Sequence, residues 1–296
     1  MKNDFEQIGV KIRILPESNY KAIFYKNCTF RIALDSNKPI TELEYPEFLD
    51  IKLTNKCLGN CPYCYQNSLP EEEHYTNIVD KLRNYFSSMS LNQRPFQIAY
   101  GGGEPTLHPE FLDVLKITKE EFDIVPNYTT NGMWTKDLLN NLNDTNYFND
   151  LIHYTKKYCG GVAISCHEHL EKYWRYAASS YYHNDIMLNF HIIISSQKSI
   201  DRFVEIYKQW ESQVSYFVLL PLTPTGRATE TPIMWEYLMR NIVDLDTSKI
   251  AFGAMFHPYL IGNKLPFSLS LYEPELMSKY LDLKDMKLYK SSFNLT

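Results

Sequence analysis

The chain of 296 residues has a formal net charge of −5, with 44% hydrophobic and 22% charged residues. This composition is typical of a globular protein with a sizeable core, and the lack of a basic stripe disfavours nucleic acid as a substrate. The N-terminal residues lack the apolar stretch of a secretory signal, and no apolar run approaches the ~20 residues of a membrane helix. We therefore expect a cytoplasmic protein without membrane contact, whose six cysteines are reduced thiols.

The first 46 residues differ in pattern from the rest of the chain. Short apolar segments at 11–15, 21–26 and 29–34, separated by turn residues, predict an N-terminal β-hairpin or meander extension over residues 1–46. We expect this extension to cover the lower end or the open side of the main domain. Alternatively, its edge strand pairs with an extended peptide substrate.

Strand and helix patterns alternate from residue 47 onward. Six apolar segments are expected to be strands, at 48–54, 96–100, 124–130, 161–166, 187–195 and 216–222. Residues with helical spacing lie between them, most clearly at 75–90, 169–182 and 199–211. Such alternation predicts parallel βαβ units, so we expect an α/β fold with a partial (β/α)6 TIM-like barrel over residues 47–225.

The pattern loosens after the sixth strand. Residues 226–296 are expected to form a C-terminal α/β extension that packs on the barrel, with helices at 232–243 and 273–283 and a strand at 250–256. No cysteine follows Cys166. A cysteine-bound metal cluster is therefore not expected in this region.

Unusual motifs follow four consecutive predicted strands. They are CLGNCPYC (57–64), GGGEP (101–105), TTNG (129–132) and SCHEH (165–169). In α/β barrels, the loops at the carboxyl ends of the strands form the active face. We therefore expect the four motifs to meet at one mouth of the barrel.

The first motif holds three closely spaced cysteines, Cys57-x₃-Cys61-x₂-Cys64. Structural zinc sites close their shell with four ligands, and iron–sulfur clusters are usually held by four cysteines. A fourth protein ligand would have to come from another cysteine or a histidine. Without it, one metal position stays open, which is typical of a catalytic metal site. The plainer interpretation is three reduced thiols on a surface loop.

The cysteine spacing, the aromatic Tyr63 before the third cysteine and the Gly-Gly-Glu at 102–104 resemble the radical S-adenosylmethionine (SAM) superfamily over about residues 47–222. The resemblance implies that Cys57, Cys61 and Cys64 bind a [4Fe–4S] cluster whose open iron is chelated by SAM. It further implies that one electron cleaves SAM to methionine and a 5′-deoxyadenosyl radical, which abstracts a hydrogen atom from the substrate. An external one-electron donor such as flavodoxin or ferredoxin is then required.

The resemblance also implies which residues contact SAM. They are Gly102, Gly103 and Glu104 at its amino group, Tyr63 and Leu220 at the adenine, Asn131 near the cofactor, Ser165 at the ribose and Arg175 at the carboxylate. Plainer roles are loop packing for Tyr63, a turn for Asn131 and a solvated helix charge for Arg175. We interpret His167 and His169 as residues that line the mouth rather than as a separate metal site, and Arg227 as a substrate contact or a surface charge.

The sequence favours a peptide- or protein-modifying oxidoreductase that catalyses epimerisation, crosslinking or oxidation. Cys166 is the candidate catalytic residue, as a hydrogen-atom donor, and Cys28 is a second candidate. One alternative is the same radical chemistry on a nucleotide or other small molecule, and another is a non-catalytic iron–sulfur redox protein. The residues before Cys57 do not match those expected of glycyl-radical activating enzymes.

Overall fold

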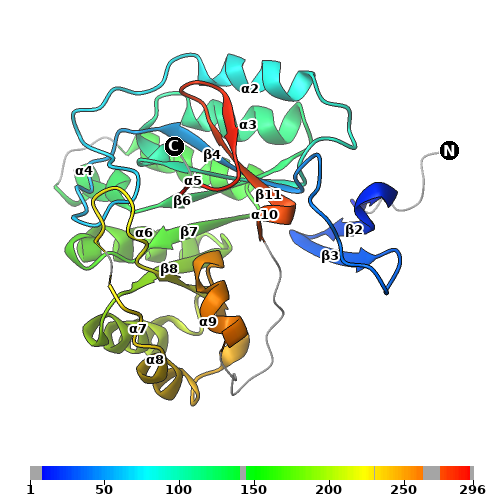
Figure 1. Cartoon of the computed structure of the whole chain (residues 1–296). Coiled ribbons are helices and arrows are strands. Elements are labelled where there is room, and N and C mark those ends of the chain that lie inside the picture. The colour runs from blue at the N-terminus through cyan, green and yellow to red at the C-terminus, as the bar shows by residue number, and fades with distance from the viewer. Residues whose placement is uncertain (1–8, 141–144, 230, 263–273, 294–296) are drawn as a thin grey trace.

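The computed structural model describes residues 9–140, 145–229, 231–262 and 274–293, so parts of both predicted extensions lie outside the described residues. One nine-stranded sheet runs through the molecule, in the order β10-β9-β8-β7-β6-β5-β4-β11-β12 (Figure 1). Its six central strands are β4 (Phe48–Thr54), β5 (Gln97–Gly102), β6 (Val125–Thr130), β7 (Gly161–Ser165), β8 (Leu188–Ile194) and β9 (Tyr216–Pro221). All neighbouring pairs are parallel except β11 with β12.

Helices connect the parallel strands and lie around the outside of the sheet (Figure 1). They are α2 (Ile78–Ser87), α3 (Phe111–Glu120), α4 (Lys136–Leu139), α5 (Asn146–Tyr158), α6 (Glu171–His183), α7 (Gln197–Trp210), α8 (Trp235–Ile242) and α9 (His257–Gly262). The strands bury alternate apolar side chains against these helices, as Leu49, Ile51 and Leu53 of β4 show. The predicted α/β class with a partial parallel barrel is confirmed, and within the described residues the sheet ends at β10 and β12 without closing.

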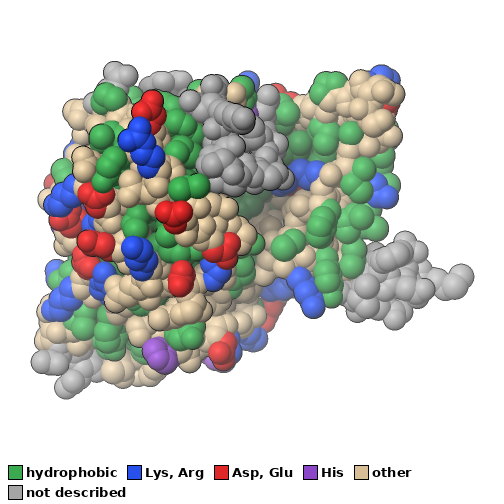
Figure 2. All heavy atoms as spheres, turned by 90° about the horizontal axis from the view of Figure 1, so that it is seen from below, with side chains coloured by type: hydrophobic (Ala, Val, Ile, Leu, Met, Phe, Trp, Pro, Cys, Tyr) green, Lys and Arg blue, Asp and Glu red, His purple; other side chains and the backbone are tan. Residues whose placement is uncertain are grey.

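The N-terminal strands form a separate antiparallel sheet of β1 (Lys11–Leu15), β2 (Tyr20–Tyr25) and β3 (Cys28–Ala33). This sheet packs near the amino ends of β5 and β6, where the ring of Phe24 stacks on that of Phe96 at 5.3 Å. Its other face is exposed, and Figure 2 shows hydrophobic side chains gathered there. They include Ile12, Ile14, Phe30, Ile32 and Leu34. The pairing of its edge strand with a peptide stays a prediction.

Two predictions for the C-terminal extension are wrong. The predicted helix at 273–283 is helical only in α10 (Pro274–Met277), and Ser278–Asp282 is strand β11, which pairs in parallel with β4. The free edge of β4 supplies backbone hydrogen bonds that override the helical spacing. The predicted strand at 250–256 ends with β10 (Ile250–Phe252), and a 3-10 turn follows it.

A short antiparallel strand, β12 (Lys287–Tyr289), completes the sheet beyond β11. The chain therefore returns to β4, the first strand of the barrel, after passing through all the others. None of the helices in the described ranges combines the length and the apolar character that a membrane span requires.

Candidate active site

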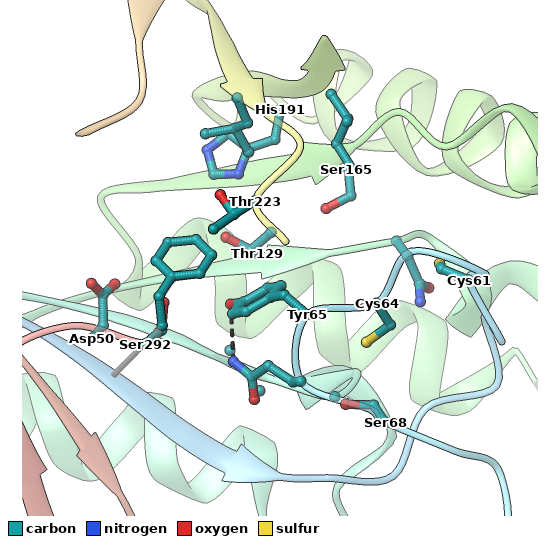
Figure 3. A pocket seen from close by; sticks show the side chains of 18 of the residues that line it. Asp50, Cys61, Cys64, Tyr65, Ser68, Thr129, Ser165, His191, Thr223 and Ser292 are labelled. Carbon is teal, nitrogen blue, oxygen red and sulfur yellow. Dashed lines mark hydrogen bonds between the residues drawn. The ribbon is translucent and has the colours of Figure 1, made fainter. Parts of the chain in front are cut away.

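A cavity of about 390 Å³ lies at the carboxyl ends of the parallel strands (Figure 3). Small-molecule sites usually have volumes of about 300–1,000 Å³. Residues of all four motifs line it, namely Cys57, Cys61, Tyr63, Cys64, Gly101, Gly102, Gly103, Glu104, Thr129, Thr130, Asn131, Ser165 and His167. The predicted convergence of the four loops at one mouth is therefore observed.

The three cysteines of the loop after β4 all face this cavity. Cys57 and Cys61 are buried, and Cys64 is partly exposed. The sulfur of Cys57 accepts hydrogen bonds from the backbone N–H of Gly59 and from the side chain of Asn131, both at 3.3 Å. Burial raises the pKa of Cys57 and of Cys61 to about 12, so a bound metal is needed to hold these groups as thiolates.

The donor set fits an iron–sulfur cluster better than a single metal ion. Among the described residues, no three His, Cys, Asp or Glu side chains are arranged to hold one ion. A cluster binds its cysteines at separate iron atoms, so the thiols need to surround it rather than meet at a point. Three thiols on one loop beside a cavity satisfy that requirement and supply no fourth sulfur.

The GGGEP motif packs directly against the start of the cysteine loop. The backbone N–H of Gly103 donates to the carbonyl of Thr54 at 2.8 Å, and that of Glu104 donates to Lys56 at 2.9 Å. A Cβ atom at Gly103 would lie 2.2 Å from the Lys56 oxygen, and Gly102 has a φ of +108°. Only glycine allows this close approach of the two backbones.

The carboxylate of Glu104 connects the second and third loops. Its Oε1 accepts from the hydroxyl of Thr106 at 2.5 Å and from that of Thr130 at 2.7 Å. Its Oε2 accepts from the backbone N–H of Asn131 at 2.7 Å. Burial raises the pKa of Glu104, while these donors stabilise its ionised form. The structure thus shows Glu104 ordering the loops, and its predicted contact with the SAM amino group stays a prediction.

The histidines of the fourth motif contact the cysteine loop. His169 Nε2 lies 3.0 Å from the carbonyl oxygen of Gly59, and His167 Nδ1 lies 3.2 Å from the hydroxyl of Tyr63. Burial lowers the pKa of His167 to about 3, so its ring is neutral. Both histidines therefore stabilise the cysteine loop at the mouth of the cavity.

Arg227 fastens the cysteine loop from a distant part of the sequence. Its guanidinium donates to the carbonyl of Cys61 at 3.0 and 3.1 Å and to that of Ser68 at 3.0 Å. Its backbone N–H donates to Cys64 at 2.9 Å. Arg227 was expected to be a substrate contact or a surface charge. The structure shows a different role, because its guanidinium binds the backbone of the cysteine loop.

Residues 51–156 match the family model described as Radical SAM superfamily. This segment holds the three cysteines, the GGGEP motif and the TTNG motif. Over these residues the chain is similar to the radical SAM superfamily. That superfamily implies SAM and an iron–sulfur cluster as cofactors.

Known proteins resemble the chain in sequence or fold. A protein of Methanocaldococcus jannaschii named as a glycyl-radical enzyme activating enzyme is 32% identical over 91 residues, which cover 30% of this chain and 34% of that relative. SuiB of Streptococcus suis, bound to S-adenosylmethionine, has a TM-score of 0.68 at 12% identity, covering 97% of this chain and 83% of SuiB. Native anSMEcpe with bound AdoMet and Cp18Cys peptide has a TM-score of 0.58 at 17% identity, covering 85% and 75%. At these identities the structural likeness shows the fold alone.

Most of the predicted SAM contacts line the cavity at the carboxyl ends of the strands, but Arg175 does not. Arg175 lies on α6, where its Nε donates to Glu171 at 2.6 Å and its Nη1 donates to Gln209 at 2.6 Å. Its guanidinium also stacks on the ring of Trp174, 4.7 Å from the centroid. The structure therefore gives Arg175 a role in packing α6 and none in the cavity.

Cys166 also does not line this cavity. Ser165 and His167 both line it, and Cys166 between them faces the other way, as alternation at a strand end requires. Its thiol is 5% exposed and donates to the carbonyl of Ile164 at 3.6 Å. The structure gives no support to Cys166 as a hydrogen-atom donor. Cys28 is exposed on β3, in the N-terminal sheet.

The cavity contains residues that the sequence did not single out. Asp50 of β4, Tyr65 of the cysteine loop, Tyr280 of β11 and Phe293 near the C-terminus line it. The sequence could have identified Asp50 as a cavity residue, because a carboxylate inside an apolar strand of a parallel sheet rarely faces a helix. Tyr280 and Phe293 gave no such signal, since their segment was predicted to be helical or had no pattern.

Proposed function

We propose that Cys57, Cys61 and Cys64 hold a [4Fe–4S] cluster, and that the enzyme uses SAM to remove a hydrogen atom from a peptide or protein substrate. The product is an epimerised, crosslinked or oxidised residue. The observation that carries this proposal is the convergence of three thiols with the GGGEP and TTNG loops on a single cavity. Three protein thiols leave one iron for SAM.

Hydrogen abstraction balances with one electron from outside the chain. When bound, the reduced cluster supplies one electron that splits the SAM C–S bond into methionine and a 5′-deoxyadenosyl radical, which takes a substrate hydrogen atom as 5′-deoxyadenosine. A flavodoxin or ferredoxin class donor provides that electron. The substrate radical that remains takes a hydrogen atom from an external donor in epimerisation, or loses an electron to an external one-electron acceptor and a proton to solvent in crosslinking or oxidation. The chain's own residues position the cysteine loop and the proposed cofactor site. Asn131 donates to the Cys57 sulfur, Glu104 fixes the loops, and Ser165 presents a hydroxyl suited to a ribose.

Three relatives support a peptide or protein as the substrate. SuiB has been solved bound to precursor peptide SuiA, with a TM-score of 0.61 at 14% identity over 86% of this chain and 62% of SuiB. The anSMEcpe structure also contains a peptide. The similarity to a protein named as a glycyl-radical enzyme activating enzyme adds a glycine residue of a protein to the proposed substrates. Residues 50–56 nevertheless differ from those expected of glycyl-radical activating enzymes.

The test is anaerobic reconstitution with iron and sulfide, followed by dithionite and SAM, with 5′-deoxyadenosine measured by chromatography. Wild type and Cys28→Ala, whose thiol is exposed on β3, are expected to form it. Cys61→Ala is expected to lose about 100-fold or more of this activity, because a cluster ligand is gone. A wild-type protein with full iron content that never forms 5′-deoxyadenosine would exclude the function.

The substrate class is tested by isotope transfer. Short peptides encoded by neighbouring genes, prepared with deuterium at their Cα and Cβ positions, are incubated with the active enzyme. Deuterium in the 5′-deoxyadenosine identifies the peptide as the hydrogen source. Stimulation of SAM cleavage by a protein-free metabolite fraction, and by no peptide, would instead establish a small-molecule substrate.

A further inference from the structure

The cavity has a second end, away from the cysteines, where Asp50 lies. Figure 3 shows Asp50 on one side of the view and Cys61 and Cys64 on the other, with Tyr65 between them. Asp50 belongs to β4, and its parallel partner on β11 is Tyr280. Both side chains line the cavity, and so does Phe293. Residues from β4 and from the C-terminal part of the chain thus meet at this end.

Asp50 is a carboxylate without a partner. Across the described part of the chain, no side chain or N–H group forms a hydrogen bond or an ion pair with it. The nearest cation along β4, Lys52, is buried in an ion pair with Asp282 at 3.5 Å. Burial raises the pKa of Asp50 to about 7. Asp50 is half-buried on the wall of the cavity. A charge partly withdrawn from water is costly unless a ligand supplies the opposite charge.

Aromatic side chains line the same cavity as this carboxylate. The rings of Tyr65 and Phe293 lie 4.9 Å apart and tilted by 40°, and Tyr280 is 3% exposed. The amide of Gln66 fixes both tyrosines, since its Nε2 donates to the Tyr65 hydroxyl at 2.9 Å and its Oε1 accepts from Tyr280 at 3.3 Å. Aromatic faces attract cations through their π electrons, and a carboxylate adds direct charge pairing. This combination is suited to an alkylammonium group.

We propose that Asp50, Tyr65, Tyr280 and Phe293 form a substrate subsite for an alkylammonium group of a peptide, either a lysine side chain or a free amino terminus. The subsite rests on the proposed function, because it takes the cysteine end as the place of hydrogen abstraction. It holds the amine at one end of the cavity and leaves the neighbouring carbon atoms to extend toward the other. Neutral groups of the same size leave the carboxylate unpaired and are therefore rejected.

The probes are Nα-acetyl-lysine amide, alaninamide with a free amino group, and Nα-acetyl-norleucine amide as the neutral analogue. Binding to the anaerobic, SAM-saturated enzyme is measured by ligand-observed NMR. At least one amine probe is expected to bind about tenfold more tightly than the norleucine probe, and whichever does so identifies the source of the amine. Asp50→Asn, which keeps the shape, is expected to abolish the preference. The matched control Asp185→Asn, at a carboxylate that is 87% exposed, retains it.

Equal binding of the three probes, or an unchanged preference in Asp50→Asn, overturns the subsite. Loss of SAM affinity in Asp50→Asn also overturns it, because Asp50 would then belong to the cofactor site. Phe293→Leu provides a second test if Asp50→Asn does not fold, and it is expected to weaken the amine probe about threefold without changing SAM affinity. Asp50-dependent amine binding in an enzyme that never forms 5′-deoxyadenosine would remove the proposed function and leave the subsite standing.

Discussion

The two ends of the cavity are built in opposite ways. At the cysteine end, the polar groups of Glu104 and Asn131 are satisfied within the protein, and glycines allow backbone to pack on backbone. At the other end, Asp50 has no partner among the described residues and shares the cavity wall with aromatic rings. The difference shows that the cofactor end is ordered before any ligand arrives. The Asp50 end gains its missing interaction only when a ligand binds.

The contrast also predicts that substitutions at the two ends change the free energy of unfolding in opposite directions. Changes at a satisfied site break hydrogen bonds or packing and so lower the free energy of unfolding. Changes that remove an unpaired buried charge raise it, because the folded state no longer has to hold that charge. The stability of four variants, each with a matched or internal control, therefore tests whether the two ends differ as described.

The largest effect is expected for Gly103→Ala. The new Cβ would lie 2.2 Å from the Lys56 carbonyl oxygen, so the GGGEP loop must move away from the cysteine loop. We expect a loss of about 3–4 kcal/mol in the free energy of unfolding, measured by urea denaturation, and a lower iron content after reconstitution. Gly101→Ala is the control, because nothing lies within 4 Å of its Cβ position. Equal stability of the two variants would contradict the close packing of the loops.

Glu104→Gln should have the next largest effect. Backbone N–H groups of Thr106 and Asn131 donate to different oxygens of Glu104, so either orientation of the amide leaves one of them facing an NH₂ group. We expect a loss of about 2–3 kcal/mol on unfolding and faster hydrogen exchange at the Asn131 amide. Glu236→Gln, at a side chain that is 87% exposed, should change neither. Unchanged exchange at Asn131 would mean that Glu104 does not connect the two loops.

The sequence predicted the cysteine end well because its contacts are short-range or follow from strand order. Apolar runs identified β4 to β9, and parallel strands bring their carboxyl ends together, which places the four motifs at one mouth. The same reasoning failed for Cys166, since one residue of alternation decides whether a side chain at a strand end faces the cavity. Arg175 is explained by a simpler pattern, the ion pair with Glu171 one helical turn away.

The Asp50 end could not be predicted in the same way. Tyr280 reaches it only because β11 pairs with β4 across more than 220 residues of sequence, and the helical spacing of 273–283 hides that strand. Arg227 likewise reaches Cys61 through bonds between residues 166 positions apart. Contacts of this kind depend on the completed fold, and no local pattern records them.

Asp50→Asn is expected to stabilise the protein without ligand. The folded pKa of about 7 lies above the unfolded value of about 3.9, so the wild type loses stability as the pH rises from 4 to 7. Above pH 7 the variant should be more stable by about 2 kcal/mol, and below pH 4 the two should agree. Tyr65 and Tyr280 have raised pKa values, so neither tyrosine titrates in this range.

Thermal unfolding at pH 5, 6, 7 and 8 measures this difference. His191, across the cavity, has a pKa lowered to about 4 by burial and so stays neutral throughout. A gain that grows with pH supports an unpaired carboxylate. A wild type that is the more stable protein at pH 8 would show that Asp50 already has a partner.

The smallest effect is expected for Arg227→Lys. An ammonium group keeps the positive charge but lacks the planar fork that bonds the carbonyls of Cys61 and Ser68 together. We expect a loss of about 1 kcal/mol on unfolding, and iron release to a chelator about fivefold faster than in the wild type under anaerobic conditions. Arg240→Lys, at a side chain that is 78% exposed, is the control. Because the charge is retained, an unchanged reduction potential together with faster release assigns the effect to loosened loop geometry. Release at the wild-type rate would mean that the cysteine loop is ordered without Arg227, and the contrast between the two ends would then rest on Glu104 and the glycines alone.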